Sequence, residues 1–503
     1  MKIIKEINQF KKTTVLMVVM SVFISFCAFF NPSGSIMSNP VIDTAIQIVD
    51  KSSMQISPYS SIDVAYKDEK FYSSLPIGAS LIAIPYYFLF KKLIEVLPND
   101  FLLSKKALEI SLLTPHVHSK EIRGLHFFLV FTFIFPLTLF LIVLSTKFFI
   151  SLEYSKNKSL LLSLLFIFGS MFFSYAGVYS RQVLASLFIW IGLLLNIVDE
   201  NKSLSKLLFY SFLMNYSLTI DYLSLLVLLP INIYFLYKLR NNMGKQLIFI
   251  FGAGICISIV LIHHQVVFGN IFSTPYDFRA SYLEKFSYSI DFNGNTYRSN
   301  DSNFINKSSM LYFSNISLSA LWGLLFSTYK GIFLFIPVLL IAPWSLYSKI
   351  RDNKFSIFEF CLLTSFLLMF LYNASLSDMF YWGGAPFYWG PRYLLSTTFL
   401  IFLLVFINIK LSNKVLFPLS VLTILVSFIG SSTSYLLVYQ FAQDYDWHLM
   451  NPIYYGLKVL FLDGINFPIT WFFKNSYSLR IVLFITILII YIITFNKVLN
   501  DKK

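Results

Sequence analysis

The sequence has few charged residues and few cysteines. Charged residues make up 13% of its 503 residues, whereas soluble proteins carry about a quarter, which argues against a soluble fold. The three cysteines, Cys27, Cys256 and Cys361, all lie in apolar runs. We interpret them as core or lipid-facing residues, and we expect neither disulfide bonds nor a cysteine-bound metal.

Motifs for nucleotide and metal chemistry are also missing. The sequence contains no Walker A motif, no GxGxxG that opens a helix and no GxSxG, so it offers no visible site for nucleotide-dependent chemistry. His263 and His264 are adjacent. Neighbours on a helix point about 100° apart, so this pair cannot share a metal as residues four apart can. We therefore expect no metal site and no cofactor.

What the sequence does have is a series of long apolar runs. Hydrophobic residues make up 57% of the chain, and runs of about 18 residues or more predict transmembrane helices. We predict an all-α polytopic membrane protein with about 11–13 transmembrane helices, in a single membrane domain over residues 1–503. The formal charge of +14 comes mostly from short loops between the runs. That distribution is typical of a membrane protein, and we expect no nucleic-acid partner.

The apolar runs divide the chain into seven predicted segments: a first span at 13–30, an outer loop at 31–75, core spans within 76–268, a polar connection at 269–317, later spans within 318–437, a second polar connection at 438–477 and a last span at 478–497. Lysines before the first span favour a cytoplasmic N-terminus, which puts loop 31–75 on the outer face of an inner or plasma membrane. The second span begins at Pro76, and Lys91 and Lys92 at its end are expected in the cytoplasm. The run 206–238 is too long for one span and contains Asp221, which predicts two half-helices.

The outer loop 31–75 is rich in carboxylates, with Asp43, Asp50, Asp63, Asp68 and Glu69. Its residues Ile42, Ile46 and Val49 recur at helical spacing, which predicts a short amphipathic helix lying on the membrane. A carboxylate at the outer face can take a proton from an attacking hydroxyl. Asp43 and Asp63 are therefore the candidate bases, and the alternative for each is an ordinary solvated loop acid.

Three arginines near the ends of apolar runs are candidate phosphate ligands, namely Arg181, Arg279 and Arg392. A guanidinium group can grip a phosphate with two parallel hydrogen bonds, and the alternative is an anchor at the membrane interface. Aromatic residues make up 19% of the chain, which fits lipid-facing and interfacial belts as well as walls for a lipid or sugar. The candidate pocket residues are Tyr72, Trp382, Trp389 and Tyr393.

Four stretches, in this order, resemble integral-membrane glycosyltransferases of the GT-C type, the group that includes protein mannosyltransferases and the aminoarabinose transferase of lipid A. They are Asp63-Val64-Ala65 with the return through Lys70 to Gly78 and Pro85, His264 to Phe278, Gly323 to Pro337, and Trp382-Gly383-Gly384 with Gly390 to Leu394. The chain departs from the pattern in three places. Pro76-Ile77-Gly78 replaces the more usual Pro-Pro-Gly or Ala-Pro-Gly, Lys330 stands where Arg is common, and the usual adjacent acidic pair after the first span is absent.

The resemblance implies a GT-C-like fold and transfer of a sugar from a polyprenyl-phosphate donor to a lipid, glycan or protein acceptor at the outer membrane face. Such a donor carries its own phosphate leaving group, so no nucleotide site is needed. Asp43 or Asp63 would deprotonate the acceptor, and Arg392, with Arg279 or Arg181, would neutralise the departing phosphate. Direct displacement would invert the anomeric centre.

Two other classes stay open at this point. A polymerase or ligase of surface polysaccharide would use the same kind of lipid-linked sugar, but its key loop usually falls later in the chain. A secondary transporter should show two similar halves with paired broken helices. The sequence offers one candidate broken run, at 206–238, and no matching half.

Overall fold

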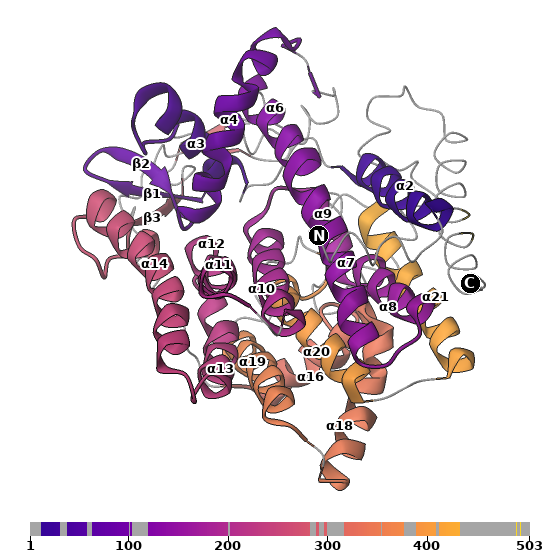
Figure 1. The fold of residues 1–503 in the computed structure, drawn as a ribbon. Helices are drawn as coiled ribbons and strands as arrows, with labels where there is room; N and C mark the ends of the chain where they lie inside the picture. The colour runs from indigo at the N-terminus through magenta and orange to yellow at the C-terminus, as the bar shows by residue number, and fades with distance from the viewer. Residues whose placement is uncertain are drawn as a thin grey trace.

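The computed structural model describes residues 12–30, 38–57, 63–99, 101–102, 119–199, 202–281, 288–290, 296–298, 316–353, 355–376, 389–408, 412–432, 489 and 493. Helices dominate this part of the chain (Figure 1). This confirms the helical fold class that the apolar runs predict.

Five helices among the described residues are long and apolar enough to cross a membrane. They are the continuous helix Lys120–Ser151, α10 (Arg181–Val198), α14 (Met243–Phe268), α19 (Ile357–Ala374) and α21 (Asn413–Ser432). Shorter apolar helices are α2 (Lys12–Phe29), α13 (Ser224–Lys238) and α20 (Leu395–Asn408). These helices confirm a multi-pass membrane protein. The total of about 11–13 spans stays a prediction, because several predicted spans lie wholly or partly outside the described residues.

The helix Lys120–Ser151 is built from α6 (Lys120–Leu129), the π-helical turn η3 (Val130–Ile134) and α7 (Phe135–Ser151). Its first turn holds the end of α4 (Gly78–Val96), because Lys120 Nζ donates to Glu95 O at 2.9 Å. Arg123, buried one turn later, donates from Nη2 to Asn99 O at 2.7 Å. These two cations fix α6 to the chain that follows α4.

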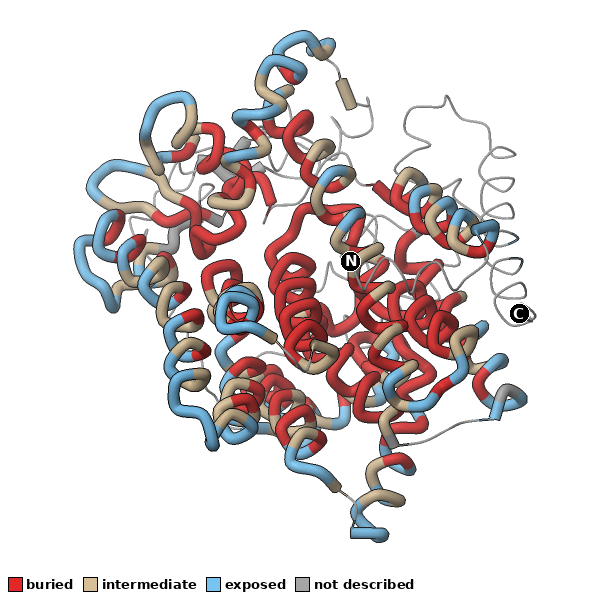
Figure 2. Tube along the Cα trace, viewed as in Figure 1, coloured by how far each residue is buried: buried red, intermediate tan, exposed pale blue. Residues whose placement is uncertain are grey.

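Helix α10 lies at the centre of the packing, and its tube is red along nearly all of its length (Figure 2). After Arg181 the helix carries no charge, and a helix that is apolar all round belongs in a core. It packs against α7, α20 and α11 (Leu204–Asn215). Gly192 allows the close approach to α11, because a Cβ atom there would lie 2.7 Å from Met214 N.

The structure describes further helices that are not among these candidate spans. They are α8 (Lys156–Gly169), α9 (Met171–Ala176), α12 (Ser217–Ile220), η4 (Pro275–Phe278), α16 (Leu318–Phe326), α17 (Ile332–Phe335), η5 (Pro337–Ile341), α18 (Ala342–Arg351) and η7 (Arg392–Leu394). The predicted break at Asp221 is confirmed, because α12 ends at Ile220 and α13 begins at Ser224.

The predicted helix in the outer loop is α3 (Asn39–Lys51). Its apolar residues Ile42 and Ile46 are buried against the protein, because α3 packs on α4 and α6. The prediction that this helix lies on the membrane with its apolar face in lipid is therefore wrong for that face. Protein side chains cover it instead.

A small sheet joins the outer loop to the connection after α14, and the sequence analysis did not predict it. Strands β1 (Asp63–Lys67) and β2 (Lys70–Ser73) form a hairpin, and β3 (Arg279–Ser281) pairs antiparallel with β1 on its other side (Figure 1). The hairpin turns at Asp68 and Glu69, both at positive φ. A second hairpin pairs β4 (Tyr288–Ile290) with β5 (Thr296–Arg298).

Helix α4 lies beside α3 and not across the membrane from it. Lys91 Nζ is 2.7 Å from Asp50 Oδ1, and Tyr87 OH donates to Asp50 Oδ2 at 2.9 Å. An ion pair this short places the last turns of α4 on the same side of the membrane as α3. The expectation that Lys91 reaches the cytoplasm while loop 31–75 is outside is therefore wrong.

Candidate active site

Arg181 is the first residue of α10 and is buried, with 6% of its surface exposed. Ser180 caps the helix by accepting from Val183 N. The Arg181 guanidinium donates from Nη1 to Tyr276 OH at 2.7 Å, and its Nε lies 4.0 Å from Asp221 Oδ2. The sequence predicted Arg181, and the structure adds the two groups that orient it.

Asp221 and Tyr222 stand at the break between α12 and α13. Asp221 is buried and accepts from Leu223 N at 3.2 Å. The Tyr222 hydroxyl lies 2.7 Å from His264 Nε2, and His264 Nδ1 lies 3.1 Å from Ile271 O. A carbonyl oxygen can only accept, so Nδ1 carries the ring proton and Tyr222 donates to Nε2. This network ties the helix break to the end of α14.

Two further buried cations lie on the loop before α20 and on the turn between α16 and α17. Arg392 is buried in η7, and the fully buried Lys330 donates from Nζ to Gly390 O at 3.0 Å. The two side chains are close enough to interact electrostatically. Gly390 has a φ of 61°, which an L side chain rarely adopts, so the loop needs glycine there.

Tyr393 brings the two cationic groups together. The Arg392 guanidinium carbon lies 5.1 Å from the centre of the Tyr393 ring, and Tyr393 also interacts electrostatically with Arg181. Two of the three predicted arginines, from α10 and η7, therefore lie within electrostatic range of Tyr393. Their convergence around Tyr393 was not predictable from spacing, because Arg181 and Arg392 are far apart in the sequence.

The structure describes the side chain of one candidate base, Asp43, and only the backbone of the other, Asp63. Asp43 has 4% of its surface exposed, its Oδ1 accepts from Gln47 Nε2 at 2.9 Å, and its Oδ2 accepts from Ser57 N at 2.9 Å. The alternative of a solvated loop acid is therefore wrong for Asp43. Asp63 begins β1 and pairs with Ser281, and Arg279 pairs with Ala65. The side chains of Asp63 and Arg279 lie outside what the structure describes.

The predicted pocket aromatics that the structure describes lie in different environments. Tyr72 is half-buried, with its ring centre 6.1 Å from that of Phe268. Trp389 packs its indole on Phe335 and on Gly430, where a Cβ atom would lie 2.2 Å from the ring. Trp389 is thus held by core contacts. Trp382 lies outside the described residues.

Three residues of this site were missed by sequence reasoning: Asp221 as a functional group, Tyr222 and Tyr276. An acid inside an apolar run was a usable signal for Asp221, and no pattern marked the tyrosines. No group of three or more His, Cys, Asp or Glu residues in the described part could hold a metal ion. The absence of a metal stays a prediction.

Replacing Tyr276 with phenylalanine is expected to lower activity of the site about tenfold, because Arg181 Nη1 loses a buried acceptor. Burial raises the pKa of the Tyr276 phenol while Arg181 lowers it, and the net shift is upward, so the phenol is neutral at physiological pH. Tyr347→Phe, on the exposed face of α18, is the control. Equal activity of the two variants would contradict a role for Tyr276 in orienting Arg181.

No protein-family model matches the chain, and no curated protein matches it. Two solved structures are similar to it, both of ArnT from Cupriavidus metallidurans. The structure in the apo state has a TM-score of 0.47 and 11% identity, and covers 96% of this chain and 76% of that chain. The structure bound to undecaprenyl phosphate has a TM-score of 0.45 and 10% identity, with 96% and 77% covered. With TM-scores below 0.5, these similarities assign no function to this chain.

Proposed function

We propose that this chain is a membrane glycosyltransferase that moves a sugar from a polyprenyl-phosphate donor to a lipid, glycan or protein acceptor at the outer membrane face. The observation that carries the proposal is the convergence of buried Arg181 and Arg392 on Tyr393, with Lys330 beside Arg392. Buried charges at membrane helices are costly and mark substrate sites. Guanidinium groups suit a phosphate, which is the leaving group of such a donor.

The reaction that fits these groups is a direct displacement. The acceptor hydroxyl oxygen bonds to the anomeric carbon as the bond from that carbon to the phosphate oxygen breaks, and the hydroxyl proton passes to a carboxylate. Arg181 and Arg392 would stabilise the charge that develops on the phosphate. Attack opposite the leaving group inverts the anomeric centre.

Asp43 is the carboxylate that the described contacts favour as base, and Asp63 stays the second candidate. Helix α3 packs on α4, and the start of α4 is fixed to the start of α10 because Tyr179 OH donates to Ala79 O at 2.6 Å. Tyr216 OH also donates to Gly78 O at 3.0 Å. Asp43 is buried and hydrogen-bonded on α3, a helix that packs on α4.

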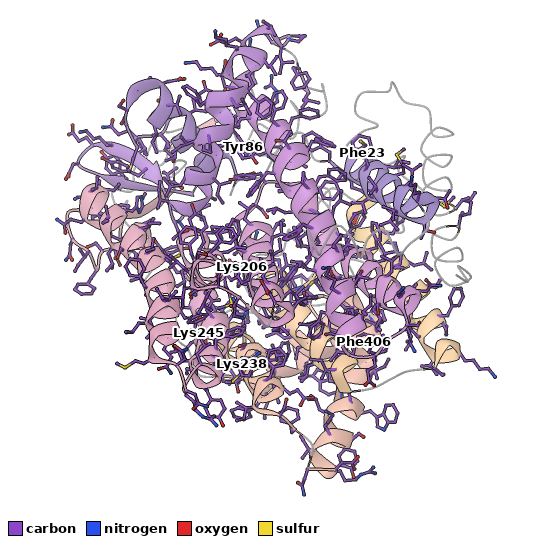
Figure 3. All side chains as sticks on the ribbon, in the orientation of Figure 1. Phe23, Tyr86, Lys206, Lys238, Lys245 and Phe406 are labelled. Atoms are coloured by element: carbon purple, nitrogen blue, oxygen red, sulfur yellow. The ribbon has the colours of Figure 1, made fainter. Side chains whose placement is uncertain are left out.

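The distribution of lysines supports an outer location for the site. Arg181 and Asp221 stand at one end of α10 and α13, and the opposite ends carry Lys202 and Lys238. Lys238 and Lys245 lie near the junction of α13 and α14, far from Tyr86 of α4 (Figure 3). The positive-inside rule favours the cytoplasm for lysine-rich helix ends, and this supports our proposal that the arginine group lies at the other face.

The test is transfer from radiolabelled polyprenyl-phosphate sugars to native lipid or glycan acceptors in membranes that contain the protein. Asp43→Asn is expected to lower the transfer rate by about 100-fold or more, the usual loss when a general base is removed. Asp50→Asn is the matched control, because Asp50 lies on the same helix and pairs with Lys91 at a half-exposed position.

Full transfer by both Asp43→Asn and Asp63→Asn would reject the base assignment. If no donor gives transfer while purified protein moves a labelled solute across vesicles, the transporter replaces the transferase. Coupling of whole glycans in place of single sugars would identify a polymerase or ligase.

A further inference from the structure

The first turn of α10 contains two buried polar side chains with unused donors. Arg181 and Gln182 have 6% and 7% of their surfaces exposed. Among the described residues, neither Arg181 Nε nor Gln182 Nε2 has a hydrogen-bond partner. An unpartnered buried donor costs about 1–3 kcal/mol, and buried polar groups are nearly always bonded. Two such donors on successive residues therefore indicate a missing acceptor.

The backbone of the same turn offers further donors. Ser180 accepts from Val183 N through its side chain and from Leu184 N through its carbonyl. The N–H groups of Arg181 and Gln182 bond no acceptor in the described part of the chain. An α-helix of 18 residues concentrates a partial positive charge at this end, which suits an anion.

We propose that the buried first turn of α10 is a phosphate-binding site in which the Gln182 amide is a ligand. The phosphate oxygens would accept from Gln182 Nε2, from Arg181 Nε and from the two free backbone N–H groups. The inference rests on the proposed function, since it assigns these atoms to the donor's phosphate. It adds a neutral hydrogen-bond donor to the arginines of the proposed site.

The position of the turn fits this role. Arg181 interacts electrostatically with Tyr393, whose ring lies against the Arg392 guanidinium. A phosphate at the start of α10 would therefore have Arg392 close by. Asp221, 4.0 Å from Arg181 Nε, orients the guanidinium without forming a hydrogen bond to that atom.

The experiment measures binding of farnesyl phosphate, and of farnesol as the phosphate-free probe, to the full chain in lipid nanodiscs. Gln182→Leu is expected to weaken farnesyl phosphate binding about tenfold, the effect of one lost hydrogen bond to a charged group, and to leave farnesol binding unchanged. Gln182→Glu is expected to weaken it further, because a carboxylate repels phosphate. Gln265→Leu, at an exposed position of α14, is the matched control.

The stability of the same variants separates a ligand role from a structural one. Because Gln182 Nε2 has no partner in the described residues, an apolar side chain of similar size should keep or raise the melting temperature of Gln182→Leu. A stable Gln182→Leu protein that binds farnesyl phosphate as tightly as the parent would overturn the proposal. So would a Gln182→Leu protein with a lower melting temperature and equally weakened farnesol binding.

Failure of this site and failure of the proposed function give different results. Weaker farnesyl phosphate binding in Gln182→Leu, with no transfer from any sugar donor, would keep the phosphate site and reject the transferase. Transfer that falls in Gln182→Leu while farnesyl phosphate binding is unchanged would keep the transferase and reject the phosphate site, since Gln182 would then contact the sugar.

Discussion

Replacement of Arg181 by glutamine is expected to slow sugar transfer by about 100-fold or more, the usual loss when a charge-stabilising donor is removed. Arg181 is buried, donates to Tyr276 OH and interacts electrostatically with Tyr393, and a glutamine amide cannot replace its charge beside the leaving phosphate. Initial rates in membranes with matched protein levels measure the effect. Arg351→Gln is the control, because Arg351 is exposed and pairs only weakly with Asp352 at the end of α18.

The same variant leaves Asp221 buried without its cation, which destabilises a protein by about 3–5 kcal/mol. The double variant Arg181→Gln with Asp221→Asn removes both charges and is expected to recover folded protein without recovering transfer. Recovery of transfer in the double variant would show that Arg181 only neutralises Asp221. A normal rate in the single variant would remove Arg181 from the site.

Gly192→Val is expected to destabilise the folded protein by about 3 kcal/mol, the upper part of the range for overpacked cores. A Cβ atom at Gly192 would lie 2.6 Å from Met214 Cβ and 2.7 Å from Met214 N and Cα. Those are backbone and near-backbone atoms of α11, so a rotamer change cannot relieve the contact and the two helices must separate. Thermal unfolding in detergent, followed by tryptophan fluorescence, measures the loss.

Gly254 on α14 is the matched control, because a Cβ atom there would meet nothing within 4 Å. Gly254→Val should shift the melting temperature little. Equal losses in the two variants would mean that glycine is needed for helix geometry in general and not for the approach of α10 to α11.

The structural features that could be predicted from the sequence are those that depend on local sequence pattern. Apolar runs identified the long helices, Asp221 marked a helix break, and the spacing of Ile42 and Ile46 identified α3. Residue type and a position near the ends of apolar runs marked Arg181 and Arg392. The contacts among these groups depend on long-range packing, which no local pattern encodes.

The β2-β1-β3 sheet and the placement of α4 were beyond sequence reasoning for physical reasons. The strands have three to five residues each, too few for a clear alternation, and β3 pairs with a strand more than 200 residues earlier in the chain. Helix α4 has 19 residues and a largely apolar sequence, which led to its prediction as a span. The packing of α4 on α3 and the contacts of Asp50 with Lys91 and Tyr87 show that it stays beside α3.

The helix Lys120–Ser151 is longer than the hydrocarbon core of a bilayer is thick. Its 32 residues extend about 48 Å at 1.5 Å per residue, whereas the hydrocarbon core of a bilayer is about 30 Å thick. Roughly 18 Å must therefore stand outside the hydrocarbon or be accommodated by tilt. We expect the α6 turn that holds the end of α4 through Lys120 and Arg123 to lie in that projecting part. A thicker bilayer would bring lipid up against α3 and α4, so turnover should depend on acyl-chain length.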